Sequence, residues 1–113
     1  MLIKKEDIEK KQNYDSCIVW QYETNNKNLS FATSKINGRY PEKGKSLNKE
    51  CNMLYFVIFG KGIIHHESGD FEIKEGDAFF FEKGKFYWVE GENLFISIST
   101  SPSWFLEQYI QLD

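Results

Sequence analysis

The sequence predicts an all-β protein, an antiparallel barrel or sandwich of many short strands. Between residues 53 and 99, runs of β-branched and aromatic residues alternate with turn segments that contain glycine, a pattern typical of such folds. The glycines of this region recur every seven or eight residues, at Gly62, Gly69, Gly76, Gly84 and Gly91. No segment after residue 16 keeps a helical hydrophobic period until the short tail at 104–112, which the pattern leaves ambiguous.

The N-terminal half is less regular. Residues 1–13 are rich in charge and are expected to form either a short helix or a frayed end. Two apolar runs, 16–22 and 29–36, predict strands that are joined by an asparagine-rich turn. Asn37-Gly38 is a strong turn signal, and the polar stretch 38–50 is expected to be a loop.

The second half predicts six strands, over 53–59, 63–66, 71–74, 78–81, 86–89 and 94–99. Phe71 and Ile73 alternate with charged residues, so one face of their strand is expected to meet water. The run 53–59 does not alternate, and both of its faces should therefore be covered. The inner face can line a barrel, and the outer face needs a second layer from the N-terminal strands or from another subunit.

The length and composition are those of one small domain, which we expect to be a barrel over 14–113 preceded by the segment 1–13. The 14 basic and 17 acidic residues give a net charge of −3, which argues against nucleic acid as a partner. No apolar run reaches the roughly 18 residues of a membrane span, so no membrane partner is expected. Cys17 and Cys51 are too few for a disulfide framework, and a reducing cytoplasm is the expected location.

The turn segments carry a resemblance to a known family. Gly60-Lys61-Gly62, Glu75-Gly76-Asp77 and Glu82-Lys83-Gly84 are similar to the turns of small cupin domains. Residues 37–42 and 101–104 add a likeness to a small single-domain bacterial cupin subgroup of unassigned function. This resemblance implies a cupin-type double-stranded β-helix, which is a jelly-roll barrel, here with extra N-terminal strands.

Cupins that bind a metal hold it inside the barrel with three histidines and a glutamate. At the corresponding positions this sequence has Met53 for the glutamate, Tyr87 for the third histidine, and either Ser46 and Asn48 or Leu47 and Lys49 for the first two. A thioether and a phenol do not replace imidazoles and a carboxylate around a divalent ion. The resemblance therefore implies a barrel that lacks the metal ligands, and we expect neither a metal nor another cofactor.

The interior positions that the resemblance implies form a candidate ligand site. Ile64 and His66 are expected to point inward, which leaves His65 facing out. The expected ligand-binding residues are Asn48, Met53, Tyr55, His66 and Tyr87. An apolar pocket with a few polar groups is typical of small-molecule sites. The leading hypothesis is a metal-independent cupin that binds a small polar organic ligand inside the barrel, either a carbohydrate or a carboxylated metabolite.

Two other functions fit the same residues. A metal-free sugar epimerase or isomerase would use His66 as the catalytic base and Tyr87 or Tyr55 as the acid. Metal-free dTDP-sugar 3,5-epimerases, which share the jelly roll, use a His–Asp dyad and a tyrosine in this way. No aspartate partner of His66 stands out, because Asp70 and Asp77 lie in expected turns. The third hypothesis is a non-catalytic sensor or accessory protein.

Residues outside the interior predict a barrel mouth and an interface. Arg39 and Tyr40 precede the first motif and are expected at the mouth, where a cation would attract an anionic ligand. The residues expected on an outward apolar surface are Leu54, Phe56, Ile58 and Trp88. Such a surface predicts a homodimer.

Overall fold

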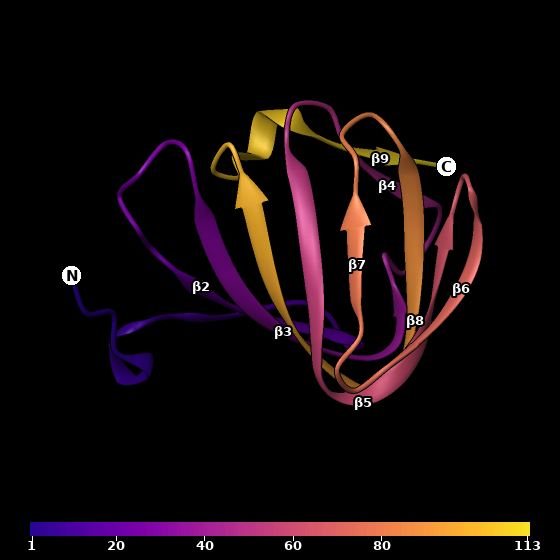
Figure 1. Cartoon of the computed structure of the whole chain (residues 1–113), viewed down its shortest axis with the longest axis horizontal. Helices are drawn as coiled ribbons and strands as arrows, with labels where there is room; N and C mark the ends of the chain where they lie inside the picture. Colours follow the sequence, from indigo (N-terminus) through magenta and orange to yellow (C-terminus); the bar gives the residue numbers. More distant parts are fainter.

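The computed structural model describes residues 1–113 as one curled, antiparallel sheet of nine strands (Figure 1). The strands are β1 (Lys10–Tyr14), β2 (Cys17–Tyr22), β3 (Ser30–Tyr40), β4 (Lys45–Asn48), β5 (Asn52–His66), β6 (Gly69–Lys74), β7 (Ala78–Phe81), β8 (Phe86–Ser101) and β9 (Tyr109–Leu112). The helical content is two 3₁₀ turns, η1 (Lys5–Asp7) and η2 (Leu106–Gln108). The prediction of an all-β barrel is confirmed. Neither helical turn has the length and apolarity needed to cross a membrane.

The N-terminal segment contributes strands to the sheet. β1 pairs with β2, and β2 pairs with β3, both antiparallel. Residues 10–13, which the sequence placed in a helix or a frayed end, therefore belong to a strand, and the only helical turn before them is η1. Because β2 supplies hydrogen-bonding partners to this polar segment, pairing outweighs its weak local preference. The extra N-terminal strands expected beside the barrel are present.

The two longest strands, β5 and β8, bend where the sequence predicted turns. Gly60 lies inside β5 with φ +82°, and a Cβ there would lie 2.1 Å from the carbonyl oxygen of Asn93. A Cβ on Gly91, inside β8, would lie 2.3 Å from the carbonyl oxygen of Ile36. These glycines allow backbones to approach closely at a bend rather than reversing the chain. Each long strand thereby runs through both halves of the barrel.

Two further expectations of local structure were wrong, and the tail that the sequence pattern left ambiguous is also resolved. Asn37-Gly38 is not a turn but an irregularity inside β3, where the Asn37 N–H donates to the carbonyl oxygen of Ser16 at 2.8 Å. The expected loop 38–50 contains the end of β3 and all of β4. The tail forms η2 and β9, and β9 pairs with β4. The sequence did not distinguish these cases because a bulge and a turn use the same residue types. It did not predict the β4–β9 pairing because the two strands are distant in sequence.

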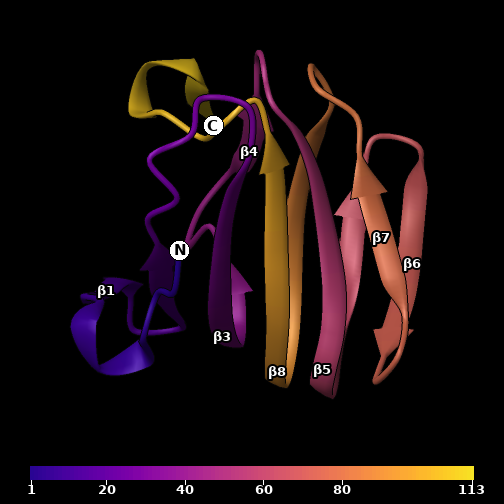
Figure 2. The same cartoon turned by 60° about the vertical axis from the view of Figure 1, so that its left-hand side comes forward.

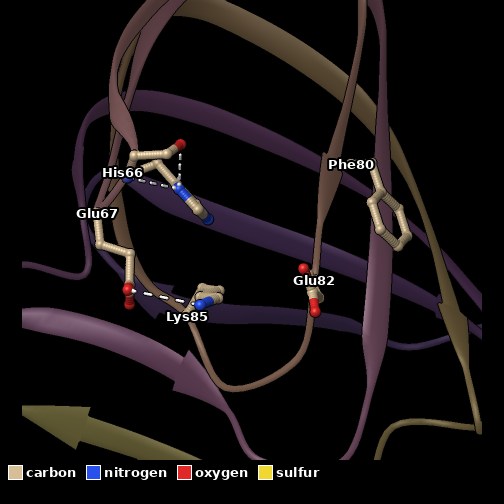
Figure 3. A pocket seen from close by; sticks show the side chains of 6 residues that line it. His66, Glu67, Phe80, Glu82 and Lys85 are labelled. Carbon is tan, nitrogen blue, oxygen red and sulfur yellow. Dashed lines mark hydrogen bonds and ion pairs between the residues drawn. The ribbon is translucent and has the colours of Figure 1, made fainter.

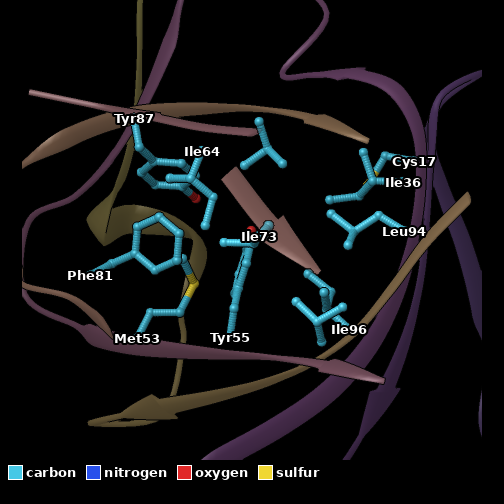
Figure 4. Packing of buried hydrophobic residues seen from close by; sticks show 12 residues of the cluster. Cys17, Ile36, Met53, Tyr55, Ile64, Ile73, Phe81, Tyr87, Leu94 and Ile96 are labelled. Atoms are coloured by element: carbon cyan, nitrogen blue, oxygen red, sulfur yellow. The ribbon is translucent and has the colours of Figure 1, made fainter. Parts of the chain in front are cut away.

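The core lies between the two halves of the curled sheet (Figure 4). On β5, the inward side chains of Met53, Tyr55 and Val57 are 5%, 2% and 1% exposed. Their outward neighbours Leu54, Phe56 and Ile58 are 41%, 45% and 42% exposed. The predicted inner face of this strand is confirmed, but no second layer covers its outer face.

Trp88 lies on the other half of the barrel. Tyr55 and Tyr87 both point into the core from facing halves and pack on the same Phe81 ring. Their neighbours Leu54 and Trp88 consequently point away from the core in opposite directions. The single outward patch that was expected to combine Trp88 with Leu54, Phe56 and Ile58 is therefore two separate surfaces.

Candidate functional site

The four positions of the metal motif all point into the barrel. Ser46 and Asn48 are 0% and 4% exposed, which selects them over Leu47 and Lys49 as the counterparts of the first two histidines. Asn48 Nδ2 contacts the sulfur of Met53 at 3.9 Å, and its Oδ1 accepts a hydrogen bond from Gln108 Nε2 at 2.8 Å. No group of three or more histidine, cysteine or acidic side chains is placed to hold a metal ion. The residues present do not fit the divalent ion of a metal cupin.

Near these motif positions the barrel interior contains buried hydroxyl groups rather than metal ligands. Burial raises the pKa values of Tyr40, Tyr55 and Tyr87 well above the ordinary value, and neighbouring tyrosines add to the effect. A hydrogen bond from Ser46 opposes the shift at Tyr87, and Tyr87 itself bonds to Tyr55. The Tyr109 hydroxyl pairs with Ser46, and it lies 3.3 Å from that of Tyr40. At neutral pH the phenols of Tyr40, Tyr55 and Tyr87 are therefore uncharged.

Phe81 packs against the predicted catalytic residues. Its ring is 2% exposed and lies 4.6 Å from the ring of Tyr55 and 4.7 Å from that of Tyr87, between centroids. The His66 ring lies 6.3 Å from the same Phe81 ring. Met53, Tyr55 and Tyr87 lie together as packed side chains of the core (Figure 4). His66 pairs with Tyr87 across β5 and β8, and the interior beside them is filled by Phe81.

His66 ends β5 and points inward, toward the ring of Phe79 at 5.6 Å. Its Nδ1 accepts a hydrogen bond from the backbone N–H of Ser68 at 3.1 Å, and the Ser68 hydroxyl lies 2.8 Å away. A backbone N–H can only donate, so the proton of the neutral ring sits on Nε2. His66 Nε2 is the one buried side-chain nitrogen or oxygen that has no hydrogen-bond partner.

The charge state of His66 agrees with this geometry. Burial lowers the pKa of the imidazole, the carboxylate of Glu67 opposes the shift, and the ammonium of Lys85 adds to it. The neutral ring therefore presents an N–H donor at Nε2 rather than a free basic nitrogen.

His66 also lines a surface pocket of about 280 Å³ (Figure 3). The lining residues are His66, Glu67, Ser68, Phe80, Glu82 and Lys85. Lys85 Nζ lies 3.9 Å from a carboxylate oxygen of Glu67, whereas Glu82 makes no hydrogen bond or ion pair. The pocket lining provides the Glu82 carboxylate, the Lys85 ammonium group, the Phe80 ring and the imidazole of His66, whose Nε2 donor is buried.

Sequence reasoning found only His66 of this pocket. Glu67 and Ser68 follow β5, and Lys85 lies just before β8. Their proximity depends on the pairing of His66 with Tyr87 across these strands. No spacing motif in the sequence predicts this arrangement, although Glu67 and Ser68 precede the expected turn at Gly69 and Lys85 follows the expected turn at Gly84.

His65 faces outward, as expected, and takes the acidic partners that His66 lacks. Its Nδ1 lies 2.8 Å from Asp70 and its Nε2 lies 2.7 Å from Glu90. The ring stacks on Trp88 with 4.7 Å between centroids. These contacts join β5, β6 and β8 on the outer surface, away from the pocket.

Arg39 and Tyr40 do not form a barrel mouth together. The Arg39 guanidinium donates to the carbonyl oxygens of Pro41 at 2.7 Å and Gly44 at 2.8 Å. It lies 5.5 Å from the ring centre of the outward Trp88. Tyr40 points the other way and packs against the core. Adjacent strand residues face opposite sides, so the predicted mouth residues are separated by the sheet.

No family model and no curated protein matches this sequence. Solved structures do match. Pac13 from Streptomyces, described as a unique nucleoside dehydratase, superposes with a TM-score of 0.89 at 12% identity, over 99% of this chain and 90% of that chain. Variants of Pac13 have been solved with uridine.

Two other structures extend the likeness. KdgF from Halomonas sp. gives a TM-score of 0.79 at 10% identity, over 92% of this chain and 96% of that chain. A mutant of the oxalate decarboxylase OxdC from Bacillus subtilis gives 0.80 at 15% identity, over 95% of this chain and 31% of that chain. The fold is that of the cupin-type jelly-roll barrel, as predicted. Identities this low establish the fold alone.

Proposed function

We propose that this chain is a metal-independent cupin that binds a small polar organic molecule at the open end of its barrel. The carrying observation is that His66, whose buried Nε2 donor has no hydrogen-bond partner, lines the pocket. Buried polar groups in proteins are nearly always hydrogen-bonded, so a ligand acceptor is the natural partner. We further propose that the chain belongs with cupins that lack the metal ligands, since Ser46, Asn48, Met53 and Tyr87 replace them.

The pocket favours a neutral ligand with hydroxyl groups over a carboxylate. Glu67 and Glu82 outnumber Lys85, and their charges would repel an anion. Carboxylates instead accept hydrogen bonds from sugar hydroxyls, and Phe80 supplies an apolar face. Pac13, which has the same fold, has been solved with uridine, a nucleoside that carries such a sugar. Of the two expected ligand classes, the carbohydrate class is the better supported.

Proton-transfer catalysis is the second candidate. Burial keeps His66 neutral, which a general base requires. The Nδ1 atom of His66, however, already accepts the backbone N–H of Ser68, so the neutral ring carries its proton on Nε2 and has no free basic nitrogen. Phe81 also packs on the rings of Tyr55 and Tyr87, so both phenols belong to a filled core. The geometry therefore supports binding better than it supports epimerisation.

A thermal-shift panel of sugars, nucleosides and carboxylates tests the proposal. A ligand at about 100 times its Kd stabilises the folded state by about 2.7 kcal/mol, which raises the Tm of a domain this size by roughly 10 °C. His66→Leu should abolish this shift, and Glu82→Gln should weaken it. The matched control is His65→Leu, the same substitution on the adjacent outward residue, which should keep the shift. An undiminished shift in His66→Leu would contradict the proposed site.

The remaining outcomes separate the alternatives. Uptake of carbon-bound deuterium by a bound sugar in D₂O, lost in both His66→Leu and His66→Gln, would favour an epimerase. His66→Gln keeps an amide donor, so binding alone should tolerate it partly. A panel without any shift would favour the sensor or accessory protein. About one tightly bound metal ion per untagged chain would contradict metal independence.

A further inference from the structure

The outer face of β3, β8, β5 and β7 is a continuous surface with a regular pattern. These four strands lie side by side (Figure 2). One row of paired residues across them is Thr33, Ser97, Phe56 and Ala78. The next row is Phe31, Ser99, Leu54 and Phe80. All of these side chains face away from the barrel interior.

This face has a ridge and a channel next to each other. The apolar ridge consists of Leu54, Phe56 and Ile58 on β5, with Phe80 beside it on β7. The hydroxyl channel consists of Thr33, Ser97 and Ser99 on β3 and β8, and the larger Phe31 lies beside Ser99 at its edge. The channel side chains are smaller than those of the ridge, and on the far side β2 places Trp20 beside Thr33 and Tyr22 beside Phe31.

The amount of exposed apolar surface is that of an interface. Leu54, Phe56, Ile58, Phe59 and Phe80 are between 41% and 60% exposed. Taking each such side chain as about 200 Å², the five present ~500 Å² of apolar surface. This lies near the upper end of what a monomer usually exposes in one patch. With the channel as rim, the face approaches the roughly 800 Å² per partner of a standard interface.

We infer that two copies of this chain pack face to face through this surface as a symmetric dimer. A two-fold axis parallel to the strands, midway between β5 and β8, exchanges β5 with β8 and β7 with β3. It therefore places Phe56 and Leu54 of each copy over the hydroxyl channel of the other, and Phe80 of each copy against Phe31 of the other. An isologous interface requires a self-complementary patch, and adjacent ridge and channel provide one. The strands of the two sheets remain aligned, which is the common packing of β-sandwiches.

Sedimentation velocity of the full chain tests the dimer. The wild type should have twice the 13.4 kDa mass of one chain at about 10 µM. Phe56→Glu, on the ridge, should reduce the mass to that of one chain. Ser97→Arg, in the channel, should do the same, and its side chain faces outward, so the barrel should fold normally. Circular dichroism confirms the fold of each variant.

The matched control is Leu112→Glu on β9. Leu112 is 37% exposed and pairs with Lys45 on the opposite half of the barrel. This variant should remain dimeric. A monomeric wild type, or a dimer that Leu112→Glu dissociates while Phe56→Glu does not, would overturn the inference.

A cross-link tests the orientation of the copies. Thr33 and Ala78 lie in one row, separated within a chain by three strand spacings of about 4.8 Å each, or ~14 Å. The proposed axis places Thr33 of one copy opposite Ala78 of the other. Thr33→Cys/Ala78→Cys treated with a short bis-maleimide should give a covalent dimer, and neither single variant should do so efficiently. Efficient cross-linking of one single variant, without the double variant exceeding it, would overturn this orientation.

Discussion

Two glycines with the same backbone conformation should respond very differently to substitution by alanine. Gly60 has φ +82° and Gly84 has φ +81°. A Cβ at Gly84 meets nothing within 4 Å, whereas at Gly60 it would lie 2.1 Å from the Asn93 carbonyl oxygen and 2.9 Å from that of Glu92. The left-handed conformation costs alanine about 1–2 kcal/mol, and the loss of unfolded-state entropy offsets about 0.4–1 kcal/mol of this cost.

Gly84→Ala should therefore lower the free energy of unfolding by about 1 kcal/mol. Gly60→Ala carries the same cost and must also move two backbone carbonyls by about 1 Å, which adds about 1–3 kcal/mol or more. The total for Gly60→Ala is about 2–4 kcal/mol, or a fall in Tm of roughly 10–15 °C against roughly 4 °C for Gly84→Ala.

Urea unfolding monitored by tryptophan fluorescence measures both values. The m-value should stay the same in the two variants, because the same surface is exposed on unfolding. Equal losses of stability in Gly60→Ala and Gly84→Ala would refute the close approach of β5 and β8 at this bend. Circular dichroism at low temperature checks that both variants are folded before unfolding is compared.

Three other perturbations have defined outcomes. The lowered pKa of His66 means that the unfolded chain takes up a proton near pH 6.5 before the folded chain does. The wild type should therefore lose stability, relative to His66→Gln, as the pH falls through this value. A relative gain in stability would contradict the lowered pKa of His66. Phe81→Ala should cost about 3–5 kcal/mol in urea unfolding, against about 0.5 kcal/mol for Leu106→Ala at a 67% exposed position. Gln108→Leu removes the acceptor of the Glu50 and Cys51 N–H groups and should lower the free energy of unfolding by about 2–4 kcal/mol. The control Gln12→Leu, on the exposed strand β1, should change stability little. Equal Tm values for the two variants would contradict the role of Gln108 as a buried hydrogen-bond acceptor.

Faces of strands were predictable, whereas bends were not. The cupin resemblance placed Met53 inside, strand parity then placed Tyr55 inside and Leu54 outside, and the exposures confirm this. Glycine in a polar context signals a departure from a straight strand, but it does not say whether the chain reverses or bends. At Gly60 the answer depends on Asn93, which is distant in sequence. The pairing of β9 with β4 depends on distant contacts in the same way.

The candidate site shows the same division. The inward direction of His66 was implied by the cupin resemblance, which placed Ile64 and His66 on the inner face, and the burial of Ile64 agrees with it. The companions of His66 could not be found in this way. Lys85 approaches Glu67 because β8 begins beside the residue at which β5 ends. No local sequence pattern predicts that these two residues lie close together.

The chemistry of the interior explains why the pocket lies at the end of the barrel. A metal cupin balances buried carboxylate and imidazole ligands with the charge of the ion. This barrel has uncharged groups at those positions, and burial keeps the phenols of Tyr55 and Tyr87 protonated. Gln108 and Asn48 bond to each other, so the deep interior retains little unsatisfied polarity. The unpaired donor lies at His66, where the strands end and solvent begins, and a ligand gains most where a buried group lacks a partner.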